Sequence, residues 1–236
     1  MTAFVSEFTG TAILLILGNG VVANVVLNKT KGNNGGLISI TLGWAMAVFV
    51  AVFISANASG AHLNPAVTLA LAIAGKFEWA LVPSYCLAQL LGAMLGAGIV
   101  WLAYRQHFDA TEDASTKLAV FSTSASIRSN TDNFIAELVA TAVFVIGVLF
   151  INVPDQNLGS IKAIPVAFLV LAIGLSLGGP TGYAINPVRD LGPRIMHALL
   201  PIKDKGNSDW GYAWLPVIAP LVGAALGALL FVYCLQ

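Results

Sequence analysis

Charged residues are scarce in this chain. Lys and Arg contribute 11 residues and Asp and Glu another 11, so charged side chains make up only 9% of the 236 residues. Soluble globular domains carry roughly 25%. The formal net charge is zero, which offers no basic surface for a nucleic acid. Such a composition indicates a membrane protein.

Residues that carry chemistry are also few. The only two cysteines, Cys86 and Cys234, lie inside apolar segments, where we expect small core residues and not a disulfide or a metal site. Two of the three histidines, His107 and His197, flank apolar segments. No nucleophile–base pair, metal-ligand cluster or phosphate-binding loop is recognisable. We therefore expect no catalytic residue, metal or cofactor, and an enzyme is the least favoured class of protein.

Long apolar runs are what the sequence has in abundance. Hydrophobic residues make up 58% of it, and the mean hydropathy is +0.85. About 20 residues of α-helix cross a bilayer core of ~30 Å. Six segments qualify, which predicts an all-α membrane protein with transmembrane helices at residues 4–27, 38–57, 80–104, 134–153, 162–178 and 212–235.

The two halves of the chain repeat each other. FVSEFTGTAILLI near the start is similar to FIAELVATAVFVI, which pairs Glu7 with Glu137. LAQLLGAMLGAG (87–98) is similar to IAPLVGAALGAL (218–229), and both carry a Gly-x-x-x-Gly pair that predicts close packing against another helix. Each half has three spans. Because three is odd, the second half enters the membrane with the opposite orientation, as inverted repeats do.

A polar stretch between residues 105 and 133 separates the halves and carries much of the charge. We expect it to be a solvated loop. The predicted organisation is a single domain, 1–236, with a first repeat at 1–108, a connecting loop at 109–130 and a second repeat at 131–236.

An Asn-Pro pair occurs once in each half, as Asn64-Pro65 and Asn186-Pro187. Asn is a preferred N-cap and Pro costs little at the first helical position, so each pair predicts a helix start. The apolar stretch 64–74 makes about 16 Å of helix, half of a membrane. Two such half-helices, entering from opposite faces, would meet near the midplane. The backbone before them, at 59–62 and 180–184, would be non-helical and would expose carbonyl groups.

HLNPAVTL at 62–69, repeated as INPVRD at 185–190, resembles the signature of the major intrinsic protein family, the aquaporins and glycerol facilitators. The resemblance covers essentially the whole chain. It implies an hourglass of six transmembrane helices and two re-entrant half-helices, with Asn64 and Asn186 at the pore midplane, assembled as a homotetramer. The second motif has Val188 where the family usually has Ala, which adds bulk without removing the cap.

The resemblance also implies a selectivity filter. Trp44, 20 residues before the first motif Asn, and Gly174, 12 before the second, match glycerol facilitators, whose filter Tyr183 and Arg189 would complete. Water-selective relatives usually carry His where Gly174 stands, so the solute-conducting branch is indicated. Tyr183 replaces the usual Phe. Its hydroxyl is expected either to narrow the filter or to offer a hydrogen bond to a solute.

Such a pore would conduct along a row of backbone carbonyls. The carbonyls expected to line it belong to Gly60, Ala61, His62, Gly182 and Ala184. Solute hydroxyls would donate to this row and accept from Arg189, whose guanidinium has five donors. The amide hydrogens of the two motif Asn residues would point into the pore. Two half-helix N-termini, each about half a positive charge, and the Arg189 charge would exclude cations while neutral solutes pass.

Other polar residues are expected to support the pore. Glu7 and Glu137 would accept hydrogen bonds from the irregular backbone before each half-helix, and the alternative is a proton relay. Asp190 would orient Arg189 or cap a loop. The imidazole of His62 would bond to neighbouring backbone.

The favoured function is passive diffusion of glycerol and other small neutral solutes, with some water. Alternatives are a facilitator mainly for protonated lactic acid, urea or dihydroxyacetone, a mainly water-conducting aquaporin, a proton-coupled transporter using the two Glu residues, and a structural protein with a closed pore. The expected partners are these solutes and the lipid bilayer, and no nucleic acid.

The expected location is the cell membrane, in a multi-pass arrangement that suits a bacterial inner membrane. The family resemblance implies that both termini are cytoplasmic. Only Lys76 and Lys162 of the 11 basic residues would then lie near the cytoplasmic side. That distribution is opposite to the positive-inside rule.

Overall fold

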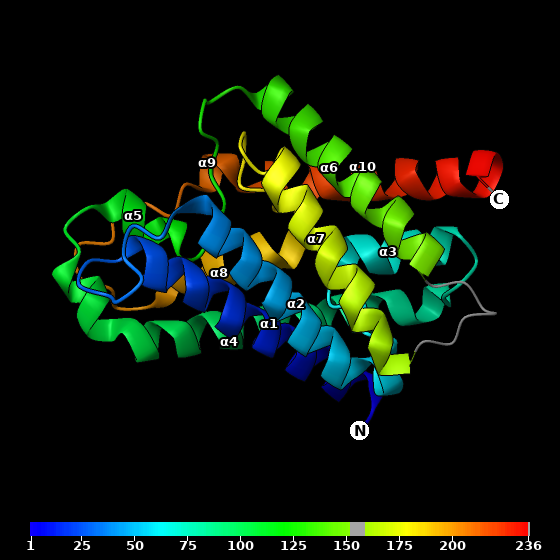
Figure 1. Ribbon diagram of the computed structural model, residues 1–236, viewed down its shortest axis with the longest axis horizontal. Helices are drawn as coiled ribbons and strands as arrows, with labels where there is room; N and C mark the ends of the chain where they lie inside the picture. Colours follow the sequence, from blue (N-terminus) through cyan, green and yellow to red (C-terminus); the bar gives the residue numbers. More distant parts are fainter. Residues whose placement is uncertain (152–158, 236) are drawn as a thin grey trace.

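The computed structural model describes residues 1–151 and 159–235 (Figure 1). Within them, six helical segments are long and apolar enough to cross a membrane. The first, second, fourth and fifth spans are α1 (Ala3–Val26), α2 (Gly36–Ser59), α6 (Asn130–Ile151) and α7 (Ala163–Leu177), which follows the 3-10 turn η2 (Gly159–Lys162). The third and sixth are α4 (Val82–Ala110), preceded by η1 (Trp79–Leu81), and α10 (Leu215–Leu230), which lies between α9 (Trp210–Ala213) and the π-helical turn η3 (Phe231–Leu235).

All six predicted spans are present, and the predicted all-α fold class is confirmed. The largest difference in boundaries is at α4, which was predicted to end at residue 104 and continues to Ala110. Its last residues, RQHFDA, contain no Gly or Pro, and Phe108 is fully buried, so packing extends the helix past the apolar run. Residues 152 and 153 of the fourth predicted span lie outside the described residues.

Two short helices follow the Asn-Pro pairs, as expected: α3 (Pro65–Ile73) and α8 (Pro187–Leu199). In each, the Asn side-chain oxygen accepts a hydrogen bond two residues on, from the Ala66 amide at 2.8 Å and from the Val188 amide at 3.1 Å. Each half-helix also packs on a long helix of the other half of the chain, α3 on α10 and α8 on α4. The two halves are therefore interlocked.

Glycines at the two Gly-x-x-x-Gly pairs allow the long helices to approach closely. A Cβ on Gly92 or Gly96 of α4 would lie 2.3 or 2.6 Å from a carbonyl oxygen of α1. The corresponding Cβ on Gly223 or Gly227 of α10 would lie 2.4 or 2.9 Å from a carbonyl oxygen of α6. Any larger residue would force the helices apart. The predicted close packing is confirmed, and it occurs in both halves, as α4 on α1 and as α10 on α6.

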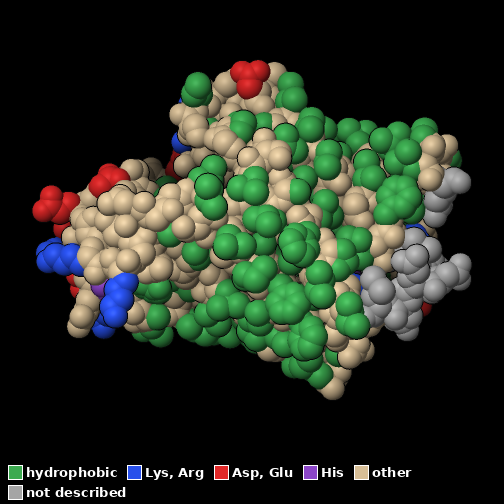
Figure 2. Space-filling view, viewed as in Figure 1, with side chains coloured by type: hydrophobic (Ala, Val, Ile, Leu, Met, Phe, Trp, Pro, Cys, Tyr) green, Lys and Arg blue, Asp and Glu red, His purple; other side chains and the backbone are tan. Residues whose placement is uncertain are grey.

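The outer surface is apolar around the middle of the molecule. Figure 2 shows hydrophobic side chains over most of this face, while Lys, Arg, Asp and Glu gather mainly at the end that carries α5 (Ala114–Ala119) and its neighbouring loops. Both chain termini lie away from that end (Figure 1). A broad apolar belt with charge beyond it is the surface expected of a protein that spans a bilayer.

The connecting stretch between α4 and α6 is solvated only in part. Its charged residues are exposed, as predicted, except for Lys117. Lys117 is 1% exposed, and its ammonium donates to the Lys203 carbonyl at 2.5 Å. Phe121 is fully buried. Asp113 caps α5, and hydrogen bonds from Ser115 and Thr116 hold the pKa of its carboxyl below the usual range. Because this stretch folds back against the core, it reaches the interior of the molecule.

Candidate functional site

Two irregular segments precede the half-helices, and both contain residues with left-handed backbone. In the first, φ is +84° at Gly60 and +53° at Ala61 and Leu63. In the second, φ is +82° at Gly182, +41° at Tyr183 and +43° at Ile185. Non-glycine residues in this region cost of order 1–3 kcal/mol each, so surrounding contacts must hold them. Because the same pattern of positive φ values occurs in both segments, we expect their carbonyl groups to have corresponding orientations.

A buried carboxylate holds each irregular segment. Glu7 of α1 accepts hydrogen bonds from the amides of His62 at 2.9 Å and Leu63 at 2.7 Å, and from the Ser59 hydroxyl and the Gln89 amide. All four hydrogen-bond partners of Glu7 belong to the first half of the chain. Their number satisfies both carboxylate oxygens.

Glu137 of α6 does the same in the second half. It accepts from the Thr181 hydroxyl at 2.6 Å and from the amides of Ala184 at 2.8 Å and Ile185 at 3.0 Å. These amides have no helical partners, because the chain around them is irregular. The two carboxylates therefore occupy matching structural positions, one behind each segment.

The two motif Asn residues make a reciprocal pair of contacts across the centre. The side-chain amide of Asn64 donates to the Ile185 carbonyl at 2.8 Å, and that of Asn186 donates to the Leu63 carbonyl at 2.9 Å. The sequence predicted that these amides would point into the pore. The structure shows that one hydrogen of each ties the two segments together. The second hydrogen of each NH₂ group is the one left for other partners.

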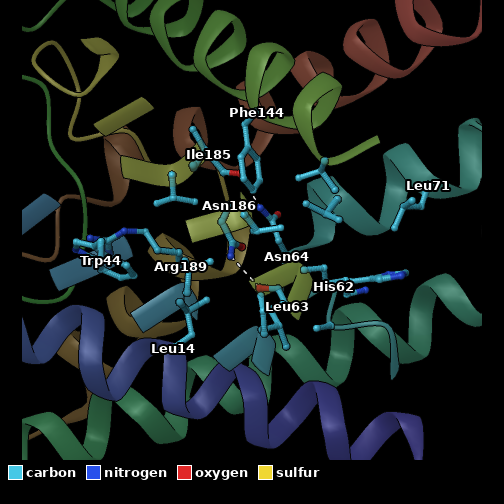
Figure 3. Close-up of a pocket in the computed structure, with 18 of the residues that line it drawn as sticks. Leu14, Trp44, His62, Leu63, Asn64, Leu71, Phe144, Ile185, Asn186 and Arg189 are labelled. Carbon is cyan, nitrogen blue, oxygen red and sulfur yellow. Dashed lines mark hydrogen bonds between the residues drawn. The ribbon is translucent and has the colours of Figure 1, made fainter. Parts of the chain in front are cut away.

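One cavity runs along these segments (Figure 3). Trp44 and Arg189 lie at one end, Asn64 and Asn186 in the middle, and His62 toward the other end. The remaining wall is aliphatic and aromatic, and it is formed by Leu14, Val48, Val52, Val67, Leu71, Phe144, Val148, Val166 and Val170. A polar stripe therefore faces an apolar wall along its length.

Three of the four residues predicted to form a filter line this cavity, namely Trp44, Tyr183 and Arg189, and Gly174 lies beside the Tyr183 ring. The guanidinium carbon of Arg189 lies 4.1 Å from the centre of the Trp44 ring. A Cβ on Gly174 would lie 2.4 Å from the Thr41 methyl group and 2.8 Å from the Cζ of Tyr183. The Tyr183 ring thus fills the space beside Gly174 and lines the cavity there.

The Tyr183 hydroxyl does not narrow the cavity. Its oxygen is inaccessible to solvent. The ring carbon that carries it lies beside Gly174 and Thr41, so the hydroxyl is buried between α2 and α7. The two sequence-based expectations for this group, a narrower filter or a hydrogen bond to the solute, both required it to face the lumen.

Asp190 forms a buried ion pair next to the filter. Its carboxylate accepts from Arg194 at 2.7 and 2.9 Å, and from the amide and hydroxyl of Thr123, both at 2.8 Å. Arg194 also donates to the carbonyls of Ser208, Asp209 and Thr123. Asp190 thus caps the connecting stretch, the second of its two predicted roles. Arg194 neutralises the negative charge of Asp190. Asp190 therefore does not neutralise the positive charge of Arg189.

The connecting stretch reaches the filter through Phe121, whose carbonyl accepts from Arg189 at 3.4 Å. No sequence pattern indicates this contact, because the stretch has the charge of a surface loop. At the other end, the His62 ring bonds to the Thr68 hydroxyl at 3.1 Å and packs on Phe77 and Tyr85. The expected bond to backbone was wrong: the imidazole is fixed by side chains.

Comparison with known proteins agrees with this arrangement. The model of the family described as Major intrinsic protein matches residues 1–231. The chain is 53% identical to a glycerol uptake facilitator protein of Streptococcus pneumoniae, over 98% of both chains, and 55% identical to glycerol uptake facilitator protein 3 of Lactiplantibacillus plantarum, over 95% of this chain and 93% of that one. The solved structure of the aquaglyceroporin from Plasmodium falciparum superposes with a TM-score of 0.86 at 35% identity, covering 98% of this chain and 95% of that one. The chain belongs to the major intrinsic protein family.

Proposed function

We propose that this protein is a membrane channel for the passive, bidirectional diffusion of glycerol and other small neutral solutes, with some water. The observation that carries the proposal is the cavity between the two irregular segments, with a polar stripe on one side and an apolar wall on the other. A polyol has the same two-sided character. Its hydroxyls need replacement hydrogen bonds when water is removed, because an unpaired polar group costs about 1–3 kcal/mol, and its carbon atoms favour the apolar wall.

In this proposal Trp44, Gly174, Tyr183 and Arg189 select the solute. The solute's hydroxyls accept from Arg189 and donate to the carbonyls of the two irregular segments. Gly174 leaves room for the Tyr183 ring, which presents an apolar face to the carbon chain. The positive charge of Arg189 and the N-termini of α3 and α8 raise the barrier for cations.

Asn64 and Asn186 act at the centre of the pore. Each caps a half-helix through its oxygen and ties the opposite segment through one amide hydrogen. The second amide hydrogen of each side chain is then available to a passing hydroxyl. Pro65 and Pro187 fix the first turn of the half-helices that follow.

The contacts of Glu7 and Glu137 support a channel over a proton-coupled transporter. Each carboxylate accepts from at least two backbone amides that have no helical partner. Protonation of either one would replace an acceptor with a donor against an N–H group. We propose that both stay ionised and hold the backbone in place.

We also propose that the protein assembles as a homotetramer in a bacterial cell membrane, with both termini on the cytoplasmic side. Large hydrophobic side chains are exposed along the spans, which provides apolar area for both lipid and neighbouring subunits. The even number of spans places the termini on one side. Fluorescent labelling of cysteines introduced at each terminus, in intact and in permeabilised cells, tests the orientation.

Stopped-flow light scattering on proteoliposomes tests the function. Vesicles containing the protein are expected to take up glycerol faster than empty vesicles after a glycerol jump, without saturation and without dependence on a pH gradient. A rate that doubles when a proton gradient is imposed would contradict passive diffusion. Rapid water flux without glycerol flux would make the protein a water channel instead.

A further inference from the structure

A basic side chain lies at the end of the cavity opposite Arg189. Lys162 is the last residue of η2, immediately before α7, and it lines the same cavity as the filter residues. Its ammonium donates to the Gly60 carbonyl at 2.7 Å. This contact joins residues 102 positions apart in the sequence. By sequence alone, Lys162 is only one of the two basic residues expected near the cytoplasmic side.

Gly60 is the residue at which α2 ends and the first irregular segment begins. Its φ of +84° turns the chain out of the helix. The next three amides of the segment are already held: Ala61 by the Ser59 hydroxyl at 3.1 Å, and His62 and Leu63 by Glu7. Those three hydrogen bonds hold backbone N–H groups in place. The Lys162 ammonium instead holds a backbone carbonyl, the kind of group to which a solute hydroxyl would donate.

We propose that Lys162 is a positioning residue that orients the Gly60 carbonyl, and so favours solutes with several hydroxyls over water at this end of the pore. A polyol must satisfy several hydroxyls at once, so it depends on the direction of successive acceptors. A water molecule is small and reorients freely, so it adapts to a displaced carbonyl. Hydrogen bonds from a charged donor are roughly twice as strong as neutral ones, so the ammonium is an effective anchor.

This inference rests on the proposed function, and its test compares glycerol and water permeability in the same proteoliposomes. In Lys162→Met the hydrogen bond is lost. Glycerol permeability is expected to fall about tenfold, the factor that corresponds to one ordinary hydrogen bond, while water permeability changes little. Lys162→Arg keeps a charged donor and is expected to restore the wild-type glycerol-to-water ratio. Lys76→Met is the matched control, because Lys76 lies over the Phe231 ring and outside the cavity.

Lys162→Gln gives a second variant whose shorter side chain loses the anchor with less change in polarity, and it is expected to shift the ratio in the same direction. A wild-type ratio in both the Met and the Gln variants would overturn the inference. So would an equal loss of water and glycerol flux that Arg does not restore, because that pattern indicates general damage to the fold. Failure of the unaltered protein to pass glycerol would contradict the proposed function, and with it this inference.

Discussion

The guanidinium of Arg189 lies over the Trp44 ring, with its central carbon 4.1 Å from the ring centre. The same ring also packs against α1, where a Cβ on Gly18 would lie 2.3 Å from it. Trp44 therefore lines the cavity and stabilises the Arg189 charge, two roles that the proposed filter requires.

Replacing Arg189 by Met should make the pore leak protons while glycerol still passes. Removing a full charge from a narrow, poorly solvated passage lowers the barrier for cations by more than ~1.4 kcal/mol, which is at least tenfold in rate. Decay of an imposed pH gradient, followed with an entrapped pH-sensitive dye, measures the leak. Arg105→Met is the control, since exposed Arg105 also lies over an indole, that of Trp101, away from the cavity. No difference between the two variants would show that the Arg189 charge is not the barrier.

Tyr183→Phe should leave the ratio of glycerol to water permeability unchanged. The hydroxyl is buried beside Thr41 and does not face the lumen. No hydrogen bond to this hydroxyl is present among the described residues, so its removal is expected to raise stability by about 1 kcal/mol, the desolvation cost of an unpaired buried polar group. Stopped-flow scattering and thermal unfolding in detergent measure the two effects. An increase in glycerol permeability alone would mean that the hydroxyl does narrow the filter.

Gly174→Ala should destabilise the protein and reduce glycerol permeability. The new Cβ would lie 2.4 Å from the Thr41 methyl and 2.8 Å from the Tyr183 ring, and overpacking of this kind costs about 1–3 kcal/mol. Thr41→Ser removes the nearer of the two contacts. The double variant is therefore expected to recover part of the lost stability, as a double-mutant cycle would detect. Strict additivity of the two changes would contradict this contact geometry.

Arg194→Met should be strongly destabilising, by about 3–5 kcal/mol, because it leaves the Asp190 carboxylate buried without its partner. The same change releases the Thr123 carbonyl and the loop near Ser208. Arg194→Lys is expected to recover little, since a single ammonium cannot reach all of these acceptors. Thermal unfolding measures the loss. The control is Arg128→Met, which breaks the more exposed ion pair between Arg128 and Asp209, so the comparison distinguishes a buried ion pair from a surface one. Equal effects of Arg194→Met and Arg128→Met would refute the distinction.

Asn64→Asp separates the two roles of the motif Asn. The carboxylate still accepts from the Ala66 amide, but it cannot donate to the Ile185 carbonyl. We expect the free energy of unfolding to fall by about 1–3 kcal/mol, because the new carboxylate and the Ile185 carbonyl are both acceptors. We expect α3 to be retained. Asn186→Asp should behave alike, because its contacts to Val188 and Leu63 are equivalent. A stable Asp variant would indicate that the cross-link between the segments is dispensable.

The spans, the repeat and the two half-helix starts can be predicted from the order of the amino acids. These features depend on local chemistry: apolar length, Asn as an N-cap and Pro in the first turn, which act over a few residues. Matching positions such as Glu7 and Glu137 could be found because the chain carries the same pattern twice. The division into repeats at 1–108 and 131–236 remains a prediction.

The pairs of groups that form hydrogen bonds across the molecule depend on how distant segments pack. Asn64 and Ile185 are 121 residues apart, and Asn186 and Leu63 are 123 apart, so no local pattern shows that each amide binds the other segment. The burial of the connecting stretch and the direction of the Tyr183 hydroxyl were likewise set by packing between distant helices. The hydrogen bond from Lys162 to Gly60 belongs to the same class. Residue type identifies the donor, but only the packed helices supply its acceptor.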